Sequence, residues 1–142
     1  MRPSRPPIGR QLSATAKIVS RAFNDVLAEA GGSVPTWLIL TTLRGGRWRT
    51  QQELAHAVGI EGPTLTRHLD GLEEAGLVER RRDATNRRAV QVELTAAGVR
   101  RHAELLKTVI AFDTQLRAGL TDTELERMRK SLAKLEQNVS GE

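Results

Sequence analysis

Hydrophobic residues recur at three- and four-residue steps over residues 8–30, and this period predicts an amphipathic helix that Gly31 and Gly32 end. Ser33 can cap a second helix, which carries Pro35 in its first turn, where a missing N–H costs nothing. Gly45 and Gly46 end that helix. The first third of the chain therefore predicts two helices joined by a short turn.

Two shorter helices follow. Thr50 and Glu53 have the Thr-x-x-Glu spacing of a capping box, in which each side chain can satisfy an unpaired amide at a helix start. The helix they begin breaks at Gly59, a residue that can adopt the left-handed conformation of a sharp turn. The next helix begins near Gly62 and ends at Gly76. Two short helices around a glycine turn are the pattern of a helix-turn-helix.

The rest of the chain changes period twice. Two short strands are predicted at 77–82 and 89–94, the second with alternating hydrophobic residues, and a polar, turn-prone link joins them. Thr95 can cap a long helix, and a second capping box at Thr121 and Glu124 starts the last one. The predicted order is α-α-α-α-β-β-α-α, a mainly α fold with a small β-hairpin.

This order predicts two regions. Residues 33–96 can form a small core of their own, as a helix-turn-helix lobe with a hairpin, whereas residues 1–7 form a loose basic arm. The long helices of 8–32 and 97–142 have only each other to pack against. A second copy of the chain would cover their hydrophobic faces, so these helices predict a dimerisation region and a symmetric homodimer.

The positive net charge of the chain indicates the kind of partner it binds. The net charge is +5 and the pI is about 10.6, which suggests a polyanion. Arginine is also abundant where coding is GC-rich, so its distribution is more informative than its total. Residues 80–88 hold five arginines and a single acid, Asp83. A run of arginines is often only a solvated face, but this run directly follows a helix-turn-helix.

Several classes of site and compartment are not expected. The chain has no cysteine, so disulfides and thiolate metal sites are excluded, and His56, His68 and His102 lie far apart. No serine stands in a G-x-S-x-G setting and no glycine-rich phosphate loop is present, so we expect neither an enzyme nor a cofactor. No run reaches the roughly 18–20 apolar residues of a membrane span. We expect a soluble, cytoplasmic protein.

The second helix of the predicted helix-turn-helix carries the candidate DNA contacts. Leu65, Leu69 and Leu72 seat it on the core, so that its N-terminal half is exposed and can enter a major groove. Arg67 can pair with guanine O6 and N7 or grip a phosphate. The residues assigned to DNA contact on the two helices are Thr50, Gln51, Pro63, Thr64, Thr66, Arg67 and His68.

The hairpin supplies the second set of candidate contacts. Arg87 and Arg88 stand at its tip, where they can reach an adjacent minor groove. We expect Asp83 to pair with Arg87 as an internal brace and Arg88 to read the groove, and we assign Arg80 and Arg82 to DNA contact as well. The alternative is a protein-interaction module whose basic hairpin faces an acidic partner; such a module would not bind duplex DNA.

The segment PTLTRHLDGLEEAGLVERR, followed by D-x-x-N-R-R-A and VELTAAG, resembles the MarR family of winged helix-turn-helix regulators. The resemblance runs from about Ile8 to Val139, and the C-terminal LTDTELERMRKSLAKLEQNV is similar to the SlyA branch. It implies a homodimer, pseudopalindromic operator DNA and, often, release by small phenolic or other anionic ligands. We therefore expect a transcriptional repressor that is associated with the nucleoid. Thr85 and Asn86 depart from the hairpin tip of many members, which have an arginine or a second acid there.

A ligand site follows from the same resemblance. It places Trp37 in a crevice between the dimerisation helices and the DNA-binding lobe, one turn before Thr41. Arg67 can supply the cation for an anionic ligand. A plain core role for Trp37 remains open, and Trp48 can pack either under the hairpin or beside a phosphate.

Overall fold

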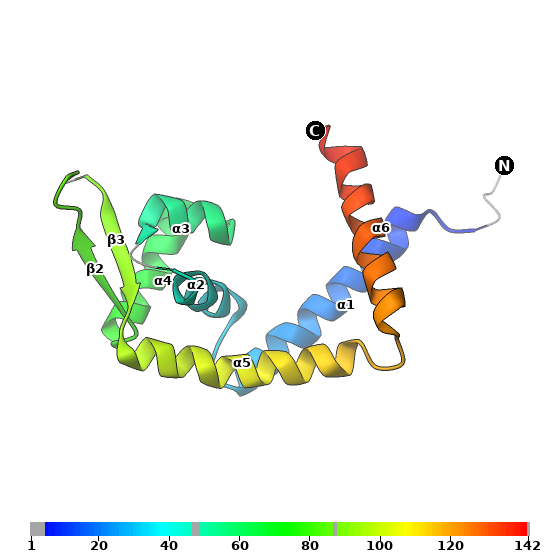
Figure 1. Ribbon diagram of the computed structural model, residues 1–142, viewed down its shortest axis with the longest axis horizontal. Coiled ribbons are helices and arrows are strands. Elements are labelled where there is room, and N and C mark those ends of the chain that lie inside the picture. The colour runs from blue at the N-terminus through cyan, green and yellow to red at the C-terminus, as the bar shows by residue number, and fades with distance from the viewer. Residues whose placement is uncertain (1–4, 47–48, 87, 142) are drawn as a thin grey trace. The chain divides into compact units, whose positions relative to one another are not determined.

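The computed structural model describes residues 5–46, 49–86 and 88–141, which divide into two compact units, Met1–Val109 and Ile110–Glu142. Six helices and three strands lie within the described residues (Figure 1). Their bounds are α1 Ile8–Glu29, α2 Val34–Arg44, β1 Arg49–Thr50, α3 Gln51–Val58, α4 Gly62–Glu74, β2 Val78–Arg82, β3 Val90–Leu94, α5 Ala96–Leu116 and α6 Asp122–Ser140. The predicted helices and hairpin strands are confirmed.

The predicted helix caps are confirmed as well. The hydroxyl of Ser33 accepts a hydrogen bond from the backbone N–H of Thr36 at 3.2 Å. Thr50 and Thr121 accept in the same way at the starts of α3 and α6, each at 3.1 Å. Each cap satisfies an amide that has no partner within its own helix, and thereby sets the residue at which the helix begins.

The sheet is antiparallel, with strand order β1-β3-β2. Strands β2 and β3 form the predicted hairpin, with Val78 opposite Leu94 at its base. The short strand β1 pairs with β3, placing Arg49 opposite Val92, and sequence patterning did not predict it. A strand of two residues is too short to show alternation, and its pairing depends on a segment about forty residues further along the chain.

Helices α2, α3 and α4 pack with the sheet around one hydrophobic core. All of its fully or nearly fully buried members are aliphatic, which fits a chain with few aromatic residues. They are Ile39, Leu43, Leu54, Leu65, Leu69, Leu72, Val78 and Val92. This core holds α4 by one face and leaves its opposite face toward solvent.

A second cluster joins α1, α2 and α5. Leu27, Leu40 and Leu105 are each fully buried there, one from each helix. Across the same junction the Arg101 guanidinium donates a hydrogen bond of 2.9 Å to the backbone oxygen of Ala30. The C-terminal end of α1 therefore contacts both α5 and α2.

The hairpin base is fixed to the start of α5 by close backbone contact. The N–H of Thr95 donates to the carbonyl oxygen of Leu77 at 3.0 Å, and its hydroxyl donates to the Gly76 carbonyl at 2.6 Å. The same hydroxyl accepts from the N–H of Gly98, so Thr95 caps α5 as predicted. A Cβ at Gly98 would overlap the Leu77 carbonyl oxygen, so this approach requires glycine.

Large hydrophobic side chains are exposed on the helices at the two ends of the chain. Ile18 of α1 is 71% exposed and Ile110 of α5 is 56% exposed. In the second unit, none of the α6 residues, Asp122–Ser140, is buried, although Met128 and Leu132 recur at helical spacing. Taken alone, no described helix has the length and apolar composition to cross a membrane; α1 and α2 meet that test only as a pair bent by 79°.

Candidate nucleic-acid interface

Helix α4 exposes the face that sequence patterning predicted. Leu65, Leu69 and Leu72 are buried in the core, and this anchors the helix along one side. On the remaining surface Pro63 and Arg67 are exposed. Thr66 is exposed too, and Thr64 and His68 are half-buried at the edges of the same face. The N-terminal half of α4 therefore presents an exposed surface made of Pro63 and several polar side chains.

A hydrogen bond links the starts of α3 and α4. Gln51 Nε2 donates to Thr66 Oγ1 at 3.3 Å, and Thr66 in turn donates to the carbonyl oxygen of Gly62 at 3.0 Å. Thr50 lies immediately before Gln51 and holds the first turn of α3 through its cap. The structure thus brings together candidate residues that are fifteen positions apart in sequence.

The hairpin turn is organised by Asp83. One of its carboxylate oxygens accepts hydrogen bonds from the backbone N–H and the hydroxyl of Thr85, both at 2.8 Å, and the other accepts from Gln91 Nε2 at 3.0 Å. These bonds, led by the Thr85 backbone N–H, lower the pKa of Asp83. The predicted Asp83–Arg87 brace lies outside the described residues, because Arg87 is not among them. Asp-x-Thr is the pattern of a side-chain-closed turn, a signal that sequence reasoning did not use.

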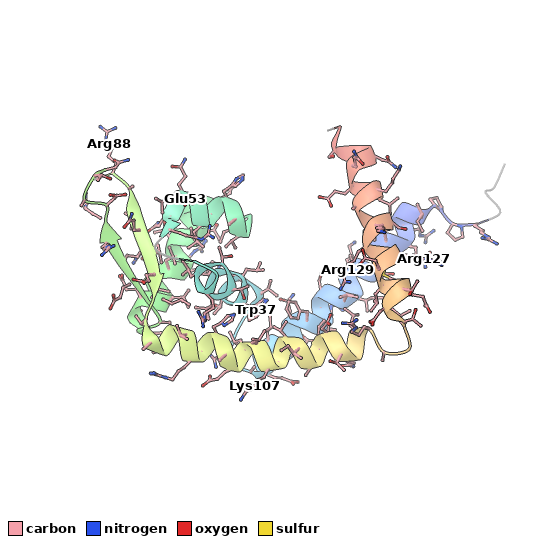
Figure 2. All side chains as sticks on the ribbon, in the orientation of Figure 1. Trp37, Glu53, Arg88, Lys107, Arg127 and Arg129 are labelled. Atoms are coloured by element: carbon pink, nitrogen blue, oxygen red, sulfur yellow. The ribbon has the colours of Figure 1, made fainter. Side chains whose placement is uncertain are left out.

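Arg88 lies at the far end of the hairpin and points away from the sheet (Figure 2). Its side chain is exposed, and its backbone N–H donates to the side-chain oxygen of Asn86 at 3.2 Å. An open groove of about 710 Å³ runs between this tip and α3, with Gln51 and Glu53 on one wall. The groove therefore separates the exposed start of the helix-turn-helix from the arginine tip.

Arg80 is placed differently from its predicted role. Its guanidinium Nη2 lies 2.7 Å from Asp70 Oδ1 and 3.1 Å from Glu73 Oε1, and its side chain is only 19% exposed. Its backbone N–H also donates to Glu73, and the side-chain hydrogen bond with Arg80 lowers the pKa of the Glu73 carboxyl. Arg80 thus joins strand β2 to α4 with its charge already paired, while Arg82, two residues on, is exposed.

A second hollow, of about 610 Å³, opens between α2 and α5. Trp37 and His102 stack in its wall, with ring centroids 5.2 Å apart and planes 6° from parallel. Thr41 and Arg44 line it from α2, so the hollow brings together Trp37 and Thr41, the two residues expected at a ligand site. Of the described residues that line it, the cationic one is Arg44, and Arg67 is not among them.

Arg44 and His102 were not predicted as part of this hollow. Positions 37, 41 and 44 follow helical spacing, so the α2 wall could have been found from sequence. His102 could not, because α2 and α5 meet only in the folded chain. Burial, and then the nearby positive charge of Arg44, lower the pKa of His102, which favours the neutral imidazole against Trp37.

Known proteins with a similar sequence and fold are transcriptional regulators. Residues 33–90 match the MarR family. The transcriptional regulator PA3341 is 32% identical with a TM-score of 0.79, over 96% of this chain and 100% of that one. A cysteine-to-serine mutant of MarR from E. coli, complexed with operator DNA, is 26% identical with a TM-score of 0.81, over 91% and 93%. The transcriptional repressor CouR, bound to a 23-mer DNA duplex, is 26% identical with a TM-score of 0.83, over 92% of each chain.

Proposed function

This chain belongs to the MarR family of transcriptional regulators, and we propose that it binds double-stranded operator DNA as a homodimer and represses transcription there. One observation carries the proposal: the exposed N-terminal half of α4 stands on the same rigid core as a hairpin with an arginine tip. Two relatives of the same fold are bound to DNA, and one of them is a repressor. We assign the chain no catalytic role.

In this proposal α4 enters the major groove and the hairpin tip reaches the flanking minor groove. Arg67, exposed at the centre of the α4 face, pairs with a guanine edge or a phosphate. Arg88 supplies the minor-groove cation, and Asp83 shapes the turn that presents it. The remaining proposed contacts are Thr50, Gln51, Pro63, Thr64, Thr66, His68, Arg82 and Arg87, whereas Arg80 supports the hairpin from within.

A second copy of the chain is the proposed cover for the exposed helix faces. Ile18 on α1, Ile110 on α5 and Leu132 on α6 are large apolar side chains left open in a single chain. A twofold dimer buries such faces against their own copies, and it also sets two α4 helices in symmetric positions. The operator is therefore expected to be pseudopalindromic, with one half-site for each α4. We place the protein in the cytoplasm, at the nucleoid, where such DNA lies.

The hollow between α2 and α5 is the proposed effector site. The exposed faces of the hollow offer an aromatic ring at Trp37, a hydroxyl at Thr41 and a cation at Arg44. These groups suit a small aromatic carboxylate, whose ring can lie against Trp37 while its charge meets Arg44. A ligand that binds one arrangement of α2 and α5 better than another shifts the population of DNA-competent dimers.

Selection from a random duplex library, followed by titration of the selected duplex, tests the function directly. The full chain should enrich a pseudopalindromic sequence and bind it far more tightly than a scrambled duplex of equal length. Affinity should fall steeply between about 50 and 200 mM salt, because each bound dimer releases counterions from phosphates. A chain that enriches no duplex, or that prefers an acidic protein to DNA, contradicts the proposal.

A further inference from the structure

The hydroxyl group of Thr66 already donates its hydrogen bond within the protein. Its single proton is donated to the carbonyl oxygen of Gly62, 3.0 Å away within α4. One lone pair accepts a hydrogen from Gln51 Nε2 at 3.3 Å. Because a hydroxyl has only one proton, Thr66 has none left to donate to a base.

The methyl group and one lone pair of the hydroxyl are then the parts of this side chain left for a partner. Thr66 is exposed on α4, directly after the fully buried Leu65 and directly before the exposed Arg67. Both contacts of its oxygen lie inside the protein, one along α4 and one toward α3. The side chain therefore presents a methyl group beside Arg67 on the exposed face of α4.

The chemistry of base edges selects one partner for such a group. Guanine offers N7 and O6, adenine offers N7 and thymine offers O4 as acceptors in the major groove, and each needs a donor. Thymine alone of the four standard bases also carries a methyl group there. We propose that Thr66 reads thymine through contact between the two methyl groups, at one position in each half-site. This inference rests on the proposed function, since it requires α4 in the major groove.

Replacing thymine by deoxyuridine tests the contact, because uracil keeps the pairing edge and loses only the methyl. Each thymine of the selected duplex is replaced singly, and the dissociation constant is measured by fluorescence anisotropy. For the wild-type chain, one substitution per half-site should weaken binding about fourfold, the effect of one buried methyl-sized group. Thr66→Ser, which keeps the hydroxyl, should bind the thymine and uracil duplexes equally at that position.

Two further variants make the result specific. Thr66→Val keeps a methyl and should preserve the thymine-to-uracil ratio, even where loss of the Gln51 contact lowers its overall affinity. Thr42→Ser is the matched control, because Thr42 makes the same bond to the carbonyl four residues earlier, that of Leu38 at 2.7 Å, on α2. It should show the wild-type ratio at every position. Circular dichroism confirms that each variant is folded.

The contrary results are distinct from failure of the proposed function. If Thr66→Ser keeps the wild-type sensitivity to uracil, or Thr66→Val loses it, the methyl contact is wrong although DNA binding stands. Selection of adenine or cytosine at the Thr66 position would show that the remaining lone pair reads the base instead. A wild-type chain that enriches no duplex overturns the proposed function itself.

Discussion

Trp37 of α2 and His102 of α5 stack face to face, with ring centroids 5.2 Å apart and planes 6° from parallel. The contact joins α2, which packs in the core beneath the sheet, to α5. Burial, and then the positive charge of Arg44, lower the pKa of His102 and favour an uncharged imidazole, because a low dielectric and a like charge both penalise the proton.

Stability should fall as His102 is protonated. Its pKa in the folded chain lies below the ordinary value of 6.5, so the unfolded chain takes up the proton first as pH falls. The contribution of His102 is therefore fully present above that ordinary value and is lost as pH falls through the lower folded pKa. Denaturant unfolding at fixed protein concentration should show a shallower pH dependence for His102→Gln than for wild type. His56→Gln, which alters an exposed imidazole on α3, serves as the control, and an unchanged pH dependence in His102→Gln would contradict the prediction.

Salicylate should bind the hollow and weaken operator binding. Its ring can lie against Trp37 and its carboxylate can pair with Arg44, so Trp37 fluorescence should be quenched in a Trp48→Phe background. By linkage, operator DNA should weaken salicylate binding by the same factor, on the order of 1–3 kcal/mol of coupling. Arg44→Gln should lose both effects. If operator affinity stayed constant at saturating salicylate, the hollow would bind the ligand without regulating DNA binding.

Arg88→Ala should weaken operator binding by about 1–3 kcal/mol, the usual range for one groove contact, without changing the fold or the dimer. The salt dependence should also become shallower, because each dimer loses two cations near phosphates. Lys107→Ala is the control, since it removes one charge per chain from the side of α5 that points away from the hairpin tip (Figure 2). Equal losses in the two variants would indicate a general charge effect rather than a contact.

Gly98→Ala should destabilise the chain by about 1–3 kcal/mol, the cost of forcing extra volume into a packed site. The added Cβ would overlap the Leu77 carbonyl oxygen, and backbone cannot yield as a flexible side chain does. Gly71→Ala is the matched control: nothing lies within 4 Å of a Cβ there, and it should stabilise α4 by about 0.5–1 kcal/mol. Chemical denaturation measures both, and a Gly98→Ala variant as stable as wild type would refute the close approach of Gly98 to the Leu77 carbonyl.

Leu132→Glu should dissociate the homodimer. Leu132 of α6 is 42% exposed in a single chain, where a carboxylate would cost little. In a dimer whose interface includes this face, the same carboxylate is buried without a partner and opposes association. Sedimentation should show a shift toward monomer for Leu132→Glu but not for the exposed control Gln137→Glu. A monomeric wild-type chain at micromolar concentration would contradict the dimer directly.

Sequence alone determined the elements whose signals are local. The caps at Ser33, Thr50 and Thr121 set helix starts because each hydroxyl bonds an amide only three residues away. The alternation through residues 90–94 likewise predicted the second hairpin strand, since a strand's period of two is visible within its own residues. The exposed face of α4 was predictable from Leu65 and Leu69, whose spacing defines the opposite, buried side.

Tertiary structure decided which groups those elements bring together. Arg80 looked from sequence like one more cation of a basic run, and only packing of β2 against α4 pairs it with Asp70 at 2.7 Å. His102 entered the hollow because α5 crosses α2 beside Trp37, a contact between residues sixty-five positions apart. Periodicity and capping depend on atoms within about one helical turn, whereas these pairings depend on how whole elements pack.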